Sequence, residues 1–144
     1  MAYRYNTARL DYRFRNLTGY LDYNNHAFVA RLPASGTLAA DDLCYIDSNG
    51  KMAKVDADAE ASASGMLAIC TEALSADGEG AFILQGFYTT SGLNAGEKLY
   101  MSTDAGTWTS TRPILAGDMV RIIGYAVSST QLFFNPDPTW IELA

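Results

Sequence analysis

The sequence predicts an all-β fold: a small β-sandwich or barrel built from two diverged tandem repeats, with an extended N-terminal arm. Short apolar segments recur at short spacing, clusters of Gly, Asp and Ser separate them, and three of the segments return in the same order. We expect the arm over residues 1–31, the first β repeat over 32–90 and the second over 91–144. Because a unit of about 50 residues buries too little surface to be stable alone, residues 32–144 should form one compact body.

The repeat consists of three strand-like blocks with polar turns between them. The paired ranges are 40–49 with 95–104, 65–74 with 118–127, and 81–85 with 131–135. Few residues are identical, so the prediction depends on the order of the blocks. The pairing aligns Cys44 with Leu99 and Cys70 with Ile123, which places both cysteines at apolar core positions.

The first repeat opens with two short strands joined by a tight turn. Residues 43–46 have the composition of a strand, and residues 51–55 would return beside them. The Asn49-Gly50 pair between them supplies the positive φ values that a tight hairpin needs. The acidic, alanine-rich stretch 56–64 has no apolar stripe, so we expect a loop or a single helical turn there.

The longer apolar blocks predict buried strands. Residues 66–74 and 119–127 show little alternation, which is typical of strands that are covered on both faces. Residues 82–88 are rich in aromatic side chains, as strands often are. Two prolines near the C-terminus remove donors from any ladder, so residues 140–143 should form only a short terminal strand or tether.

Charge is divided unevenly along the chain. Residues 1–31 carry five arginines against two aspartates, a net +3, whereas residues 32–144 carry five basic and fourteen acidic side chains, a net −9. A basic arm before an acidic body predicts a tail that engages a partner. No apolar run has the length of a transmembrane helix and no signal-peptide pattern follows Met1, so we expect no membrane partner and synthesis in a cytoplasm.

The reactive residue types form no known catalytic or metal-binding motif. Cys44 and Cys70 could pair or bind a metal, but we expect two buried free thiols, since a structural zinc set needs more ligands. His26 stands alone after two asparagines, with no nucleophile motif around it. The acids lie in turns and none fits the EF-hand spacing; a loop calcium site and a glycosidase-type acid pair stay as alternatives. We therefore expect no enzyme activity, no cofactor and no metal site.

The N-terminal arm has the most unusual composition of the chain. It interleaves aromatic and arginine side chains, which are the types most often found at binding hot spots. These residues are Tyr3, Arg4, Tyr5, Arg9, Tyr12, Arg13, Phe14 and Arg15. We expect them to bind a partner; an edge strand of the body is the alternative, because residues 12–15 alternate with a period of two. Nucleic acid is disfavoured as the partner, because the acidic body would repel phosphate.

Several stretches of the body are similar to one known family. They are residues 45–51, 56–59, 92–102, 116–127 and 133–136. On these stretches, residues 36–143 resemble the small decoration (cement) proteins of tailed-bacteriophage capsids. The resemblance implies a β-rich virion structural protein, frequently a homotrimer, made in the host cytoplasm. It would bind the outer capsid surface and stabilise the capsid by bridging major capsid protein subunits.

A receptor- or glycan-binding module of a phage tail fibre or spike is the alternative function. Such a module would stack exposed aromatic rings on sugars. Tyr88, Trp108 and Trp140 are the candidate residues for that contact.

Overall fold

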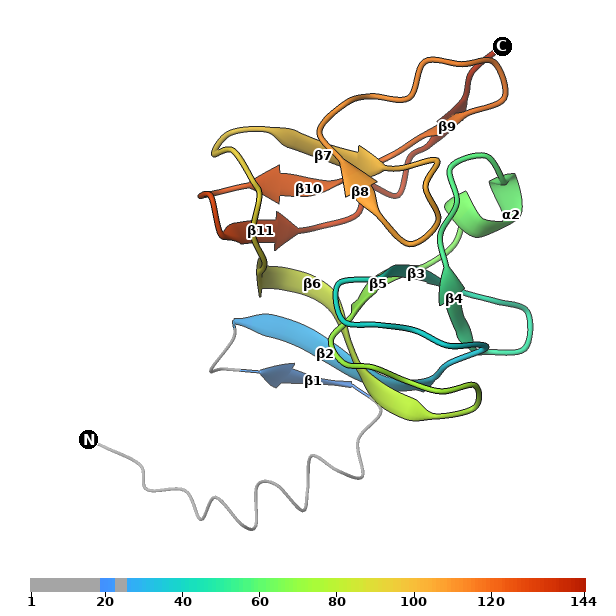
Figure 1. Ribbon diagram of the computed structural model, residues 1–144, viewed down its shortest axis with the longest axis vertical. Coiled ribbons are helices and arrows are strands. Elements are labelled where there is room, and N and C mark those ends of the chain that lie inside the picture. The colour runs from blue at the N-terminus through green and yellow to red at the C-terminus, as the bar shows by residue number, and fades with distance from the viewer. Residues whose placement is uncertain (1–18, 23–25) are drawn as a thin grey trace.

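The fold is nearly all β, which confirms the predicted class (Figure 1). The structure is a computed structural model that describes residues 19–22 and 26–144. The candidate partner-binding residues of the arm, from Tyr3 to Arg15, lie outside the described residues. The elements are β1 (Gly19–Asp22), β2 (Ala27–Pro33), β3 (Leu43–Ile46), β4 (Met52–Lys54), α2 (Glu60–Ala63), β5 (Leu67–Cys70), β6 (Glu79–Thr89), β7 (Lys98–Met101), β8 (Trp108–Thr109), β9 (Met119–Val120), β10 (Ile122–Ala126), β11 (Gln131–Phe134) and β12 (Ile141–Glu142).

The long strand β6 organises the main sheet. On one side it pairs with β2, which carries β1; on the other side its first half pairs with β5 and its second half with β11. The sheet then continues through β5, β3 and β4 in one direction and through β11, β10, β7 and β8 in the other. All these pairings are antiparallel, and the sheet curls into a half-barrel, while β9 and β12 form a separate ribbon (Figure 1).

The two halves of the main sheet have the same strand order. In the first half β3 lies between β4 and β5, and in the second half β7 lies between β8 and β10. The strands β6 and β11, which end the two series, pair directly with each other. Two copies of one unit would give this order, and the tandem repeat itself stays a prediction.

Two apolar clusters lie on opposite faces of the sheet. The inner cluster fills the concave face and takes residues from both halves, among them Leu43, Ile69, Leu99 and Phe134. The outer cluster belongs to the first half alone, and the segments 34–42 and 71–78 cover it. Its buried members are Ala34, Leu38, Cys44, Met52, Ala68, Cys70, Leu74 and Phe82.

Both cysteines are buried free thiols, as predicted, but their place in the repeat differs from the alignment. Cys44 and Cys70 belong to the outer cluster, whereas Leu99 and Ile123 belong to the inner cluster. On β3 it is Leu43 that faces the inner cluster. Because neighbouring residues of a strand point to opposite faces, an alignment shifted by one residue exchanges the two faces.

The body of the fold begins before residue 32. β2 pairs with β6 along its whole length, and Ala27 and Val29 are buried in the inner cluster. The boundary that the sequence suggested, at residue 31, therefore falls inside a paired strand. The sequence pattern assigned this strand to the charged arm because of Arg31. The side chain of Arg31 lies at the surface, with its Nε 3.3 Å from the carboxylate of Glu79.

Arg121 joins the two halves from a buried position, with 6% of its surface exposed. Its Nη1 donates to the carbonyl oxygens of Ala63 at 2.8 Å and Gly65 at 2.6 Å, and its Nε donates to the carbonyl of Asp137 at 2.7 Å. The expected unbroken strand over residues 119–127 is wrong at this point, because the chain divides there into β9 and β10. Burial lowers the pKa of Arg121, and the three carbonyls replace the water that burial removes.

Candidate functional site

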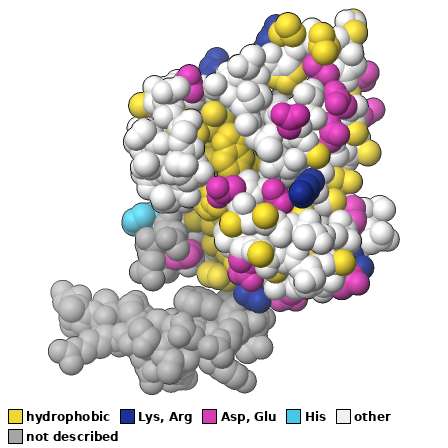
Figure 2. All heavy atoms as spheres, in the orientation of Figure 1, with side chains coloured by type: hydrophobic (Ala, Val, Ile, Leu, Met, Phe, Trp, Pro, Cys, Tyr) yellow, Lys and Arg dark blue, Asp and Glu magenta, His cyan; other side chains and the backbone are white. Residues whose placement is uncertain are grey.

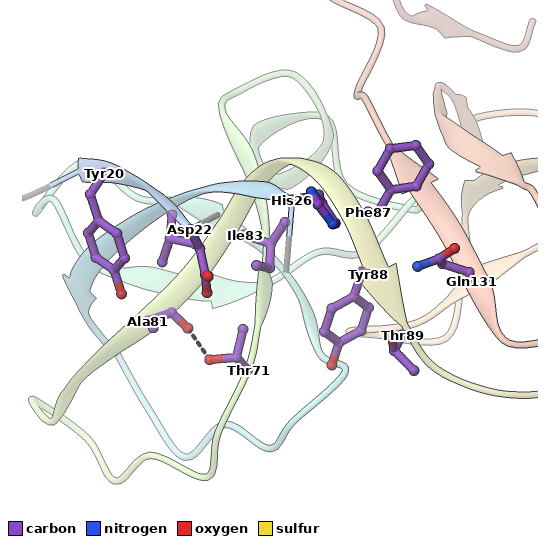
Figure 3. Close-up of a pocket in the computed structure, with 11 residues that line it drawn as sticks. Tyr20, Asp22, His26, Thr71, Ala81, Ile83, Phe87, Tyr88, Thr89 and Gln131 are labelled. Carbon is purple, nitrogen blue, oxygen red and sulfur yellow. Dashed lines mark hydrogen bonds between the residues drawn. The ribbon is translucent and has the colours of Figure 1, made fainter. Parts of the chain in front are cut away.

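A hollow of about 290 Å³ is lined by residues of β1, β2 and β6 (Figure 3). We call it the inner pocket. Its lining consists of Tyr20, Asp22, His26, Val29, Thr71, Ala81, Ile83, Phe87, Tyr88, Thr89 and Gln131. Figure 2 shows hydrophobic side chains in a band near the middle of one face of the molecule, with acidic side chains beside it.

Strand register places the floor of the inner pocket. Tyr20 lies opposite Val29, and Val29 lies opposite Ile83, so these three side chains share one face of the sheet. In the next row Asp22 lies opposite Ala27, and Ala27 opposite a glycine on β6. Asp22 lines the pocket from this row.

Glycine is required at position 86 by the close approach of β2. A Cβ atom there would lie 2.5 Å from the carbonyl oxygen of His26 and 2.6 Å from the Cα of Ala27, and the φ of Gly86 is 127°. L-residues rarely adopt that conformation. Gly86 therefore lets the end of the β1–β2 pair lie directly against β6 at the rim of the pocket.

Tyr88 forms a fixed wall of the inner pocket. Its hydroxyl donates to the carboxylate of Asp41, and the ring of Trp108 packs edge-on against it, with the centroids 6.5 Å apart and the planes at 89°. Thr90 donates to the other oxygen of Asp41 at 3.3 Å. Burial and, next, the bond to Asp41 raise the pKa of Tyr88, so the phenol stays protonated at neutral pH.

Two residues at this site hold an uncommon backbone conformation. His26, on the rim, has a φ of 54°, and Asp41, which holds Tyr88, has a φ of 75°. Positive φ is uncommon for residues other than glycine, although Asp and His are enriched among the exceptions. Strained residues cluster at functional sites, which makes this pocket a candidate for one.

The inner pocket is lined by a small set of hydroxyl, carboxylate, amide and imidazole groups. Thr71 lies in the connection after β5. Its hydroxyl donates to the carbonyl of Ala81 at 2.7 Å, so the hydroxyl proton is already engaged. The lining includes one carboxylate, Asp22, and one imidazole, His26. Across the described parts of the chain, no group of three side chains is placed to hold a metal ion.

The opposite face of the same strands exposes large apolar side chains. Leu21, Phe28, Phe87, Tyr125 and Val127 are 50%, 44%, 37%, 41% and 46% exposed. The half-buried Phe133 lies between two of them in the register, opposite Phe87 and opposite Tyr125. We call these six residues the aromatic face.

A second hollow of about 290 Å³, wider open than the inner pocket, lies in the aromatic face. Leu21, Phe28, Phe87 and Phe133 are its large apolar residues, and the rings of Phe87 and Phe133 lie 5.3 Å apart. Contiguous exposed apolar surface on a protein marks an interaction site. The groove has the size of one or two inserted side chains of a partner.

Sequence reasoning found part of these surfaces. Tyr88 was singled out and lines the inner pocket, while Trp108 and Trp140 are half-buried and pack against the inner cluster. His26 has no motif around it in the sequence, and it lies beside both hollows. The aromatic face was missed, although two phenylalanines next to each other at 133 and 134 signal a strand that is apolar on both faces.

A scan against protein-family models and a search of curated proteins both find no match. Among the described residues, no helix has the length and apolar character needed to cross a membrane.

Proposed function

We propose that this protein is a virion structural protein that decorates and stabilises a phage capsid by bridging major capsid protein subunits. The aromatic face is the observation that carries the proposal. Five of its six residues come from five paired strands and the sixth, Val127, directly follows β10, so the sheet presents them together. A cement protein needs a preformed contact surface of this kind and no reaction chemistry.

The first strand brings this surface next to the arm. Leu21 of β1 belongs to the aromatic face, and among the described residues β1 pairs with β2. The basic residues before Gly19 would then approach the same partner surface as the aromatic face.

A homotrimer would strengthen this binding through avidity. If each copy holds one capsid site, the second and third contacts form at a high effective concentration. Weak binding by a single aromatic face is then enough for stable decoration. The sedimentation of the purified protein and its copy number on virions would test the proposed assembly.

The central experiment measures binding of the full chain to expanded, empty phage heads. We expect saturable binding in a fixed ratio to capsid subunits. Phe87→Ser should weaken binding by at least tenfold, because it places a polar group in the middle of the aromatic face. Ile114→Ser is the matched control, since Ile114 is 73% exposed in a loop outside that face.

Two results would contradict the proposal. Bare heads at saturating protein would remove the capsid as a partner, and equal binding of the two serine variants would remove the aromatic face as the contact. Deletion of residues 1–18 is the test of the arm. Deletion of 1–31 is unsuitable, because it would remove β1 and most of β2.

Receptor or glycan recognition by a tail fibre or spike is the second candidate function. The position of Tyr88 favours it, because this ring stands in the wall of the inner pocket. Binding to host cells by the purified chain, with no binding to heads, would support this function over decoration.

A further inference from the structure

The inner pocket contains a preformed aromatic platform. The ring of Tyr88 is held at its hydroxyl by Asp41 and by its perpendicular contact with the ring of Trp108, so little side-chain entropy is lost when a ligand packs on it. Figure 3 shows Tyr20 and Tyr88 at the two sides of the pocket, with Asp22 and Thr71 between them. The rings of Phe87 and Tyr88 point in opposite directions from β6.

The polar lining of the pocket selects against anionic ligands. The lining contains no lysine or arginine, so it offers no charge to hold a phosphate or a carboxylate. It provides donors and acceptors of mixed kinds instead: a carboxylate, hydroxyls, an amide and an imidazole. Such groups bind neutral ligands that carry many hydroxyl groups.

The volume narrows the ligand further. Drug-sized ligands occupy pockets of about 300–1,000 Å³, so a hollow of about 290 Å³ fits a ligand with the size of one sugar ring. A pyranose has an apolar face of C–H groups and a rim of hydroxyls. The pocket matches both features, with Val29 and Ile83 in its floor, Tyr88 in its wall and polar groups around them.

We propose that the inner pocket binds one neutral pyranose residue, stacked on Tyr88 with its hydroxyls toward Asp22 and Thr71. This goes beyond capsid decoration, deepens the second candidate function by naming a ligand, and uses the face of the strands opposite the aromatic face. A decorated particle would gain a weak sugar-binding site on each copy of the protein. Many copies on one particle would convert weak sites into firm attachment to a glycan-coated surface.

The test is saturation-transfer NMR on the full chain with the methyl glycosides of glucose, galactose, mannose and N-acetylglucosamine. We expect transfer to the ring protons of at least one of them, with a Kd on the order of 1 mM. Tetramethylammonium serves as a cationic probe. Transfer to that probe, with none to any glycoside, would overturn the proposal in favour of a cation site, and transfer to no probe would overturn it outright.

Two variant pairs locate the binding. Tyr88→Leu should abolish the glycoside signal, whereas Tyr125→Leu, the same change on the aromatic face, should leave it intact. If Tyr88→Leu does not fold, Thr71→Val decides, with at least fivefold weaker binding expected. Thr109→Val is its control on β8, outside the pocket. If the two variants of either pair bound the glycoside equally well, the inner pocket would not be its binding site. Sugar binding and head binding are separate measurements, so either can fail without the other.

Discussion

The two halves of the sheet share a strand order but differ on their outer face. In the first half this face is covered, because segments 34–42 and 71–78 fold over Cys44, Met52 and Phe82. In the second half the same face is exposed, as at Tyr125 on β10, which is 41% exposed. The first half therefore buries a second core on its outer face, whereas the outer face of the second half is exposed.

The outer face of the strand β6 is covered in its first part and exposed in its second part. Phe82 and Phe87 both point to the outer side, yet Phe82 is fully buried in the outer cluster and Phe87 is 37% exposed. The register shifts in between, after Phe28 on β2, where Val29 pairs with Ile83 and Phe28 with Gln85. A bulge of this kind bends the strand, so its second part leaves the covering segments behind.

The largest expected effect compares these two phenylalanines. Phe82→Ala should lower the free energy of unfolding by about 3–5 kcal/mol, because it leaves a cavity in a closed core. Phe87→Ala should lower it by only about 1 kcal/mol, mainly through its contact with Phe133. Urea unfolding of both variants is the measurement. Equal losses would mean that the aromatic face is as well covered as the outer cluster.

The next effect concerns the connection between the halves. Arg121→Leu should lower the free energy of unfolding by about 3 kcal/mol, because it leaves the carbonyls of Ala63, Gly65 and Asp137 without their donor. Arg112→Leu is the control, at an exposed position of the second half. If Arg121→Leu lowers the free energy of unfolding no more than Arg112→Leu does, water replaces the guanidinium at these carbonyls.

A third prediction uses the two thiols to test how well the outer cluster of the first half is covered. Burial raises the pKa of the Cys44 thiol and also that of Cys70. The thiolate is the reactive form, so both cysteines should resist a disulfide reagent at pH 8 in the folded protein and react fully in urea. Rapid reaction without denaturant would show that the cover over the outer cluster opens readily.

The smallest effect lies where loops of the two halves meet. Desolvation and, next, a hydrogen bond with Asp118 raise the pKa of Asp58. A raised folded-state pKa means that the folded protein holds this proton more tightly than the unfolded chain. The stabilising contribution of Asp58 is therefore present at low pH and is lost as the pH rises through its folded pKa.

Replacing the charge should remove this dependence. Asp58→Asn should raise the melting temperature slightly at pH 7 and leave it unchanged at pH 4. Thermal unfolding at both values is the measurement, with the exposed Glu72→Gln variant as control. If Asp58→Asn raised the melting temperature at pH 4 as much as at pH 7, the charge of Asp58 would not be the cause.

Much of the fold follows from local patterns. A turn forms at residues 47–50 as predicted, with Asp47 accepting bonds from the backbone of Asn49 and Lys51. Of the Asn49-Gly50 pair only Gly50 has a positive φ, 75°. The stretch 56–64 forms the single helical turn that was one of its two expected outcomes, and a short strand, β12, ends the chain. These features depend on a few neighbouring residues, so the sequence is enough to predict them.

The candidate sites were less predictable, because they depend on which faces of distant strands meet. Tyr88 was recognised by residue type, but its fixation by Asp41 joins positions 47 residues apart. The aromatic face is spread over β1, β2, β6, β10 and β11, and none of these strands alone has an unusual composition. The alternation of a strand separates its two faces but leaves open which face becomes covered.

The sequence by itself determined an all-β chain, its main turns, and the burial of Cys44 and Cys70. Only the tertiary structure decided that Leu43, and not Cys44, shares the inner core with Leu99, and that β2 belongs to the body. It also decided which outer face stays bare. The physical reason is that hydrophobic burial is non-directional: it requires apolar side chains to be covered, and only the path of the chain in space provides the cover.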